Sequence, residues 1–131
     1  MKIIKFKKKE RFKYKRKVII KELILNILVG IHSFEKKKRQ RVKFNIEILT
    51  DPCVTPNSKD LNSILNYEEV VIKIKRLTNS THHELLEDLA ENIFNILFKN
   101  KLVKKINLKL EKLDILKKTK SVGIEITKTR I

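Results

Sequence analysis

The sequence of 131 residues contains few of the residues on which disulfide-bonded or loop-rich proteins depend. It has one cysteine, Cys53, two prolines, two glycines and no tryptophan. A single cysteine excludes an intramolecular disulfide and is typical of a reducing compartment. The scarcity of proline and glycine argues against long linkers and fibrous repeats. With 41% hydrophobic residues, the chain is expected to form one globular domain around a single core.

Long apolar runs are also absent from the sequence. No run approaches the roughly 18 residues of a membrane-spanning helix, and the N-terminal residues lack the apolar segment of a secretory signal. We therefore expect a cytoplasmic protein without a membrane partner. A glycine-rich phosphate loop and a Gly-x-Ser-x-Gly motif are missing as well. His82 and His83 are adjacent, and we interpret both as solvated residues before a helix, with no metal site and no cofactor.

Basic residues, in contrast, are abundant and give a formal net charge of +17. The segment 1–17, MKIIKFKKKERFKYKRK, holds eight lysines, two arginines and one glutamate. We predict that this segment is a solvated basic tail and that residues 18–131 form the folded domain. The chain has only six arginines, the residue that best recognises guanine. We therefore do not expect nucleic acid to be the main partner, and a non-enzymatic basic nucleic-acid-binding protein stays an alternative.

The hydrophobic pattern predicts the element order β-β-α-α-β-β. Apolar or alternating runs predict strands at residues 18–30, 41–50, 105–112 and 121–127. Helical spacing predicts helices at residues 67–79 and 83–100, the second capped by Asn79 or Thr81. The segment 51–63, which holds both prolines, is the long irregular connection. This order predicts an α+β fold with a four-stranded antiparallel sheet and two helices on one face.

The alternating strands also predict which face of the sheet the helices leave uncovered. Period-two alternation places Lys43, Asn45, Glu47, Asn107 and Lys109 on the face opposite the apolar residues. This face is polar enough to meet water or the lumen of an assembled barrel.

A few polar side chains near the ends of predicted elements are candidates for acid–base chemistry. Glu35 follows the first strand, Tyr67 begins the first helix, and Lys112 ends the third strand. Glu87, preceded by Leu86, lies in the first turn of the second helix, where backbone N–H groups are free. Taken singly, each has an ordinary structural explanation, such as a loop charge or a carboxylate favoured by the helix dipole.

Their combination resembles the dihydroneopterin aldolase family, which includes dihydroneopterin triphosphate epimerase. The resemblance is carried by the spacing Gly30-x4-Glu35-x4-Gln40, then by "LNY", "LLE", and Lys112 ten residues before "VGIEI". It covers residues 18 to about 128 and leaves out the basic tail. No single motif is specific, and the ordered set carries the likeness.

The resemblance implies the tunnelling fold, in which subunits join their sheets into a ring and two rings stack into an octamer, with active sites between neighbouring subunits. Glu87 would hold the guanidine-like edge of a pterin, supported by the Leu86 backbone, because a carboxylate accepts two N–H bonds there. Glu35 would contact the polyhydroxy side chain. Tyr67 would come from the adjacent subunit, and Lys112 matches the family's lysine.

The activity implied is that of an aldehyde-lyase in folate biosynthesis. Metal-free retro-aldol cleavage would convert 7,8-dihydroneopterin into 6-hydroxymethyl-7,8-dihydropterin and glycolaldehyde. The C=N bond between N5 and C6 would serve as the electron sink, so Lys112 would act as an acid–base group without forming an imine, and Tyr67 would help to move the proton.

One departure from the family pattern favours the epimerase as the alternative. Leu113 follows Lys112 where aldolases usually have proline. Lys117, Lys118 and Lys120 lie just beyond and are available for a triphosphate tail. Both activities share the retro-aldol step, after which an epimerase rejoins the fragments and an aldolase releases them.

Overall fold

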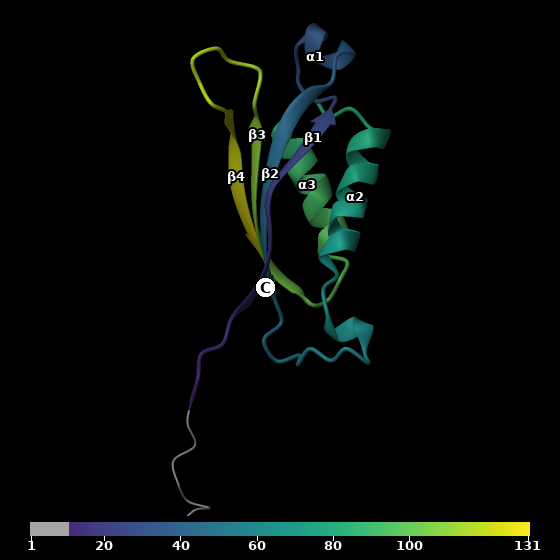
Figure 1. Ribbon diagram of the computed structural model, residues 1–131, viewed down its shortest axis with the longest axis vertical. Helices are drawn as coiled ribbons and strands as arrows, with labels where there is room; N and C mark the ends of the chain where they lie inside the picture. Colours follow the sequence, from purple (N-terminus) through teal and green to yellow (C-terminus); the bar gives the residue numbers. More distant parts are fainter. Residues whose placement is uncertain (1–10) are drawn as a thin grey trace, which may run out of the picture.

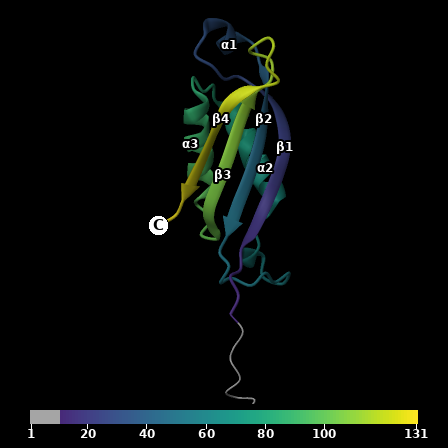
Figure 2. The ribbon, with the colours of Figure 1, turned by 90° about the vertical axis from the view of Figure 1, so that its left-hand side faces the viewer.

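The computed structural model describes residues 11–131, which form one antiparallel sheet with two main helices on one face (Figure 1, Figure 2). The strands, in their spatial order, are β1 (Arg16–Ile27), β2 (Gln40–Thr50), β3 (Val103–Lys112) and β4 (Val122–Thr129). The helices are α1 (Ser33–Lys37), the 3-10 turn η2 (Leu61–Ser63), α2 (Tyr67–Ser80) and α3 (Leu86–Leu97). The predicted α+β class and the four-stranded antiparallel sheet are confirmed.

The two central strands form the floor of the core. Val42, Phe44, Ile46 and Ile48 of β2 are at most 1% exposed, because alternate side chains of a strand face the same side. Helix α2 lies against β1, and α3 lies against β3 and β4 (Figure 1). The opposite face carries the predicted polar side chains, which are half-buried or exposed. Within residues 11–131, no helix is long and apolar enough to cross a membrane.

Strand β1 differs from the predicted strand at residues 18–30. It begins at Arg16, inside the segment that we expected to be a tail, and residues 1–10 lie outside the described part of the chain. A bulge at Glu22, which has a φ of 56°, shifts its pairing with β2. The strand ends at Ile27, since Val29 instead forms an isolated bridge with His83. The apolar run therefore continues beyond the sheet.

The helix ends also differ from the expectation. Helix α3 begins at Leu86, three residues after the predicted start, and its N-cap residue Leu85 makes no side-chain capping bond. The predicted cap at Asn79 or Thr81 is wrong, because α2 extends through Asn79 and Thr81 ends that helix. Asn66 caps α2 instead, where its Oδ1 accepts from the Glu68 backbone N–H at 2.9 Å.

Candidate active site

Glu35 and Lys112 form a buried ion pair at one end of the sheet. Lys112 Nζ donates to Glu35 Oε2 at 2.7 Å, although the two residues are 77 positions apart in the sequence. The short helix α1 presents the carboxylate, and the last residue of β3 presents the ammonium. Their side chains are only 2% and 16% exposed. The pair is therefore a polar centre built into the edge of the core.

Two further donors satisfy the Glu35 carboxylate. Gln40 Nε2 donates to Oε2 at 2.9 Å, and the His32 backbone N–H donates to Oε1 at 3.3 Å. Burial by itself raises the pKa of Glu35, but the hydrogen bonds from Lys112, Gln40 and His32 together outweigh it. The pKa of Glu35 therefore lies below its usual value, and the group is a carboxylate at neutral pH.

Gln40 holds the Glu35 carboxylate in position, a role that its spacing in the sequence did not predict. Its Nε2 donates both to Glu35 and to the Val29 carbonyl, the latter at 2.7 Å. Its Oε1 is buried and has no hydrogen-bond partner among residues 11–131. A buried acceptor without a partner is an exception to the rule that buried polar groups are hydrogen-bonded, and it lies beside the ion pair.

The turn at Gly30 packs directly against the Glu35 carboxyl group. Gly30 has a φ of 132°, and a Cβ at this position would overlap the Glu35 carboxyl group. Its N–H donates to the His83 carbonyl at 2.9 Å, and its carbonyl lies 3.0 Å from His82 Nε2. Glycine is needed here because the backbone conformation and the close approach both exclude a side chain.

His83 is buried, so the interpretation of both histidines as solvated residues is wrong for this one. It is 5% exposed, and Asn92 Nδ2 lies 3.0 Å from its Nε2. Burial lowers the pKa of His83, which keeps the ring neutral. Since the His83 backbone also holds Gly30, this residue joins α3 to the loop that carries Glu35. Sequence pattern gave no signal for this role, because a polar residue before a helix is usually solvated.

The predicted pterin-binding residues, Leu86 and Glu87, occupy the first turn of α3. Leu86 is buried and Glu87 is exposed. The bridge between Val29 and His83 fixes this turn at the same end of the sheet as the ion pair. Free N–H groups and the positive end of the helix dipole favour an anionic side chain at this place.

Tyr67 lies at the other end of the sheet. The residue is 60% exposed, at the start of α2. A hollow of about 910 Å³ beside it is lined also by Asp51, which follows β2, and by Leu102, which precedes β3. Lys112, in contrast, pairs with Val42 near the beginning of β2. One chain therefore brings Glu35 and Lys112 together and keeps Tyr67 apart from them.

Comparison with known proteins assigns the chain to a family. A family model described as "FolB: Dihydroneopterin aldolase" matches residues 18–127. This chain belongs to the dihydroneopterin aldolase family.

Two relatives of similar length are named for two different activities. The dihydroneopterin triphosphate 2'-epimerase of Pseudomonas aeruginosa is 26% identical over 84% of this chain and 89% of that protein. The dihydroneopterin aldolase of Haemophilus influenzae is 25% identical over 86% of this chain and 95% of that protein.

A longer relative contains the family domain as a small part. The folic acid synthesis protein FOL1 of Dictyostelium discoideum is 23% identical over 86% of this chain, and the match spans 17% of that protein.

Solved structures of the family share the fold. The dihydroneopterin aldolase of E. coli in complex with neopterin has a TM-score of 0.77 at 22% identity, covering 86% of this chain and 98% of that one. The Burkholderia enzyme bound to guanine has a TM-score of 0.76 at 19% identity, covering 89% and 93%. The sheet and helices described above are thus the tunnelling fold of this family.

Proposed function

We propose that this member of the family is a dihydroneopterin aldolase, an aldehyde-lyase that acts in the cytoplasm in folate biosynthesis. It would cleave 7,8-dihydroneopterin into 6-hydroxymethyl-7,8-dihydropterin and glycolaldehyde. The observation that carries the proposal is the buried pair of Lys112 and Glu35, which places an ammonium and a carboxylate 2.7 Å apart. The Haemophilus relative named as an aldolase supports it.

The reaction requires proton transfers and an electron sink. The C2′ hydroxyl loses its proton, the bond between C1′ and C2′ breaks, and glycolaldehyde leaves. The electron pair moves through C6 onto N5, which takes up a proton and forms an enamine; C1′ is then protonated. Lys112 is the acid–base group near N5, and Tyr67 assists in moving the proton. Glu35 orients the polyhydroxy side chain of the substrate.

Glu87 would bind the heterocycle. A pterin presents two neighbouring N–H donors on one edge, and a carboxylate accepts both in a charge-assisted pair. Guanine has the same edge, and the Burkholderia relative was solved with guanine bound. The neopterin bound to the E. coli relative has it as well. The backbone of Leu86 would support the same ring.

A complete site would need two copies of the chain. We infer that Tyr67 enters the site of a neighbouring subunit, because within one chain it lies at the far end of the sheet. Subunits that join β1 to β4 would form a ring, and two rings would stack into an octamer. Residues 18–131 would supply the assembling domain, and the basic segment 1–17 would precede it.

A fluorescence assay with 7,8-dihydroneopterin tests the proposal. Wild-type protein should release the hydroxymethyl product, and Lys112→Ala should lower kcat by about 100-fold or more. Lys109→Ala, on the polar face of the sheet, is the matched control and should retain activity. A Lys112→Ala protein with wild-type kcat would refute the assignment. Covalent trapping of substrate on Lys112 by borohydride would refute the imine-free chemistry.

The epimerase activity is the second candidate. Leu113 after Lys112 and the Pseudomonas relative favour it. Incubation with dihydroneopterin triphosphate distinguishes the two activities. An epimerase yields the 2′ epimer with the side chain intact, whereas an aldolase cleaves the side chain and releases an aldehyde.

A further inference from the structure

Arg16, the first residue of β1, holds the beginning of the loop that leads from β2 to α2. Its Nη2 donates to the carbonyls of Asp51 and Val54 at 3.2 and 3.1 Å, and its Nε donates to Thr50 Oγ1 at 3.2 Å. Loop carbonyls have no partners in the sheet, so they need donors from elsewhere in the fold or from water. A residue that we expected in a solvated tail is therefore a half-buried tie between two parts of the fold.

The guanidinium group is suited to this position. Its planar fork directs several N–H groups outward at once and reaches three acceptors, whereas a lysine side chain ends in a single nitrogen. The group also lies over the ring of Tyr14, with 5.7 Å between Cζ and the ring centroid. In a chain with few arginines, Arg16 thus occupies a place where lysine could make only part of the contacts.

The segment that Arg16 holds is a tight turn of fixed shape. The Val54 N–H donates to the Asp51 carbonyl at 3.2 Å, and the Cys53 N–H donates to Asp51 Oδ1 at 2.9 Å. Pro52 occupies the second position, where its fixed φ favours such a turn. Because the turn is held by its own hydrogen bonds, Arg16 determines where the turn lies rather than which shape it has.

This turn forms part of the wall of the hollow beside Tyr67. Asp51 and Val54 both line that hollow together with Tyr67. Tyr67 itself is set by the first turn of α2, which Asn66 caps. The hollow therefore keeps its shape only while the turn stays beside α2, and the contacts of Arg16 hold the turn there.

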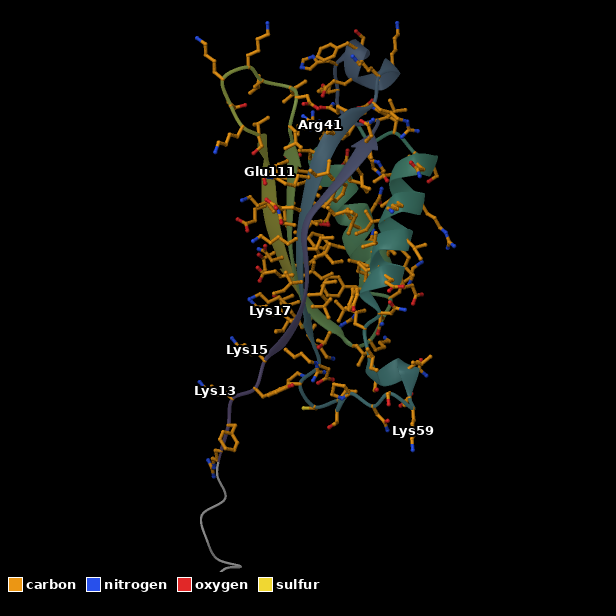
Figure 3. The ribbon with its side chains drawn as sticks, in the orientation of Figure 1. Lys13, Lys15, Lys17, Arg41, Lys59 and Glu111 are labelled. Carbon is orange, nitrogen blue, oxygen red and sulfur yellow. The ribbon has the colours of Figure 1, made fainter. Side chains whose placement is uncertain are left out.

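Arg16 lies at the same end of the molecule as this hollow. It pairs with Thr50, the last residue of β2. In Figure 3, its neighbour Lys15 lies toward Lys59 of the loop between β2 and α2, and Arg41 lies at the opposite end. A substitution of Arg16 should therefore disturb the hollow and leave the ion pair at the other end intact.

We propose that Arg16 is a positioning residue for the proposed reaction. By holding the Asp51–Val54 turn, it keeps the hollow beside Tyr67 in the shape that receives the Glu35–Lys112 end of a neighbouring subunit. The proposal rests on the proposed function, in which Tyr67 completes a neighbour's site. Arg16 touches neither the substrate nor the reacting atoms, and its effect is on a site whose ion pair belongs to another copy.

Steady-state kinetics with 7,8-dihydroneopterin measure the contribution of Arg16. Arg16→Ala should lower kcat by about tenfold, because Tyr67 then meets the neighbouring site out of place. KM should stay near its wild-type value, since under the proposed function Glu35 and Glu87 bind the substrate from the other end. Lys15→Ala is the matched control, because it removes one charge from the adjacent, exposed residue, and it should keep the wild-type kcat. Equal losses in the two variants would overturn the proposal.

Mixed assemblies show which half of the site Arg16 supports. Arg16→Ala refolded with Lys112→Ala should recover about one quarter of wild-type activity, because about a quarter of the sites then join two intact ends. Arg16→Ala refolded with Tyr67→Ala should give only the mean of the two variants measured alone, because every site then has a damaged Tyr67 end. A simple loss of folded protein would lower both mixtures alike. Equal recovery in the two mixtures, or the reverse pattern, would overturn the proposal.

A second variant keeps the test decisive if Arg16→Ala does not fold. Arg16→Lys retains the charge and the apolar stem but offers one nitrogen to three acceptors, so it should show the same pattern in the mixtures with a smaller loss of kcat. Urea denaturation establishes that this variant is folded. A folded Arg16→Lys protein with wild-type kcat would show that the guanidinium fork is not needed and would overturn the proposal.

Tyrosine fluorescence separates failure of this proposal from failure of the proposed function. The chain has two tyrosines and no tryptophan, so in a Tyr14→Phe parent the emission comes from Tyr67 alone. Quenching by acrylamide should increase when Arg16→Ala is added to this parent, because the neighbouring subunit then covers the Tyr67 ring less well. If quenching increases and dihydroneopterin is not turned over, the positioning role stands and the aldolase assignment fails. If the parent cleaves dihydroneopterin and Arg16→Ala changes neither quenching nor kcat, the positioning role fails and the aldolase assignment stands.

Discussion

The two ends of the sheet differ in whether their polar side chains have hydrogen-bond partners within the described residues of one chain. At one end, Glu35 is buried, receives three hydrogen bonds and pairs with Lys112. At the other, Tyr67 is exposed beside an open hollow, and no described residue donates to or accepts from its hydroxyl. The first end is preorganised within one chain. Under the proposed function, the second end presents a phenol that would act only in the site of another copy.

This difference has energetic consequences. A buried carboxylate is stable only while its partners remain, so each contact at the Glu35 end contributes to folding as well as to the site. An exposed ring at a helix start contributes little to folding. Substitutions at the first end should therefore lower both stability and activity, whereas substitutions of Tyr67 should lower activity alone.

The largest expected effect comes from mixing two inactive variants. Tyr67→Ala and Lys112→Ala chains should each be nearly inactive, because each removes one half of every site. Chains refolded together should recover about one quarter of wild-type activity, since random assembly joins an intact Lys112 end to an intact Tyr67 end in about one site of four. The measurement is product fluorescence after co-refolding.

The control for this experiment mixes two variants of the same end. Glu87→Ala and Lys112→Ala chains should recover nothing, because every site then has a damaged first end. Recovery in this mixture, or none in the first, would contradict the division of the site between the two ends.

The next largest effect concerns Glu35→Gln, which leaves the Lys112 ammonium unpaired. We expect a loss of about 3 kcal/mol in unfolding free energy at neutral pH, measured by urea denaturation. The lowered pKa of Glu35 means that the unfolded chain takes up this proton first as the pH falls. The contribution of Glu35 is therefore full well above its usual pKa of 4.5, and it is lost progressively as the pH falls from that value through the lower pKa of the folded state. Wild type and variant should converge in acid, and a constant difference would contradict this origin.

A smaller effect is expected for Gly30→Ala. The positive φ and the overlap of the new Cβ with the Glu35 carboxyl group should cost about 2 kcal/mol. Because the carboxylate must move, kcat should fall together with the melting temperature. Gly123 is unsuitable as a control, since its Cβ would meet the β3 backbone. Ser80→Ala, at the exposed end of α2, should change neither quantity. A stable but inactive Gly30→Ala protein would show that positioning is separable from folding.

The smallest effect is the titration of His83. Because its pKa is lowered by burial, the unfolded chain binds the proton first, and stability falls as the pH drops below the usual value of 6.5. The loss between pH 7 and pH 5.5 is at most about 1.3 kcal/mol, the limit for one histidine that stays neutral when folded. Differential scanning calorimetry should show this slope in the wild type and its absence in His83→Gln. The same slope in the variant would assign it to other groups.

Much of the fold was predictable, because the residues of its central strands obey a simple period. The alternation through β2 and β3 placed Phe44 and Leu110 inside and Lys109 outside, as the structure confirms. The bulge at Glu22 was not predictable, since nothing in the local pattern of β1 marks where its pairing with β2 slips. The start of α3 was predicted three residues too early for a similar reason. The apolar stripe indicates which face of a helix packs, but it does not indicate the residue at which the helix begins.

The candidate site was predictable only as separate residues. Glu35 and Lys112 could be named from their positions at element ends, but their contact spans 77 positions and depends on how β3 ends beside the start of β2. The roles of Gln40 and His83 arise from tertiary contacts, which bury His83 and the Oε1 atom of Gln40.

The sequence by itself determined the order of the elements, the apolar face of the sheet and the positive net charge of the chain, because these follow from local periodicity and composition. Tertiary structure alone decided that a glutamate surrounded by lysines is buried, that one distant lysine pairs with it, and that the tyrosine lies at the far end. The physical reason is that desolvation and hydrogen bonding act between groups that only the folded chain brings together.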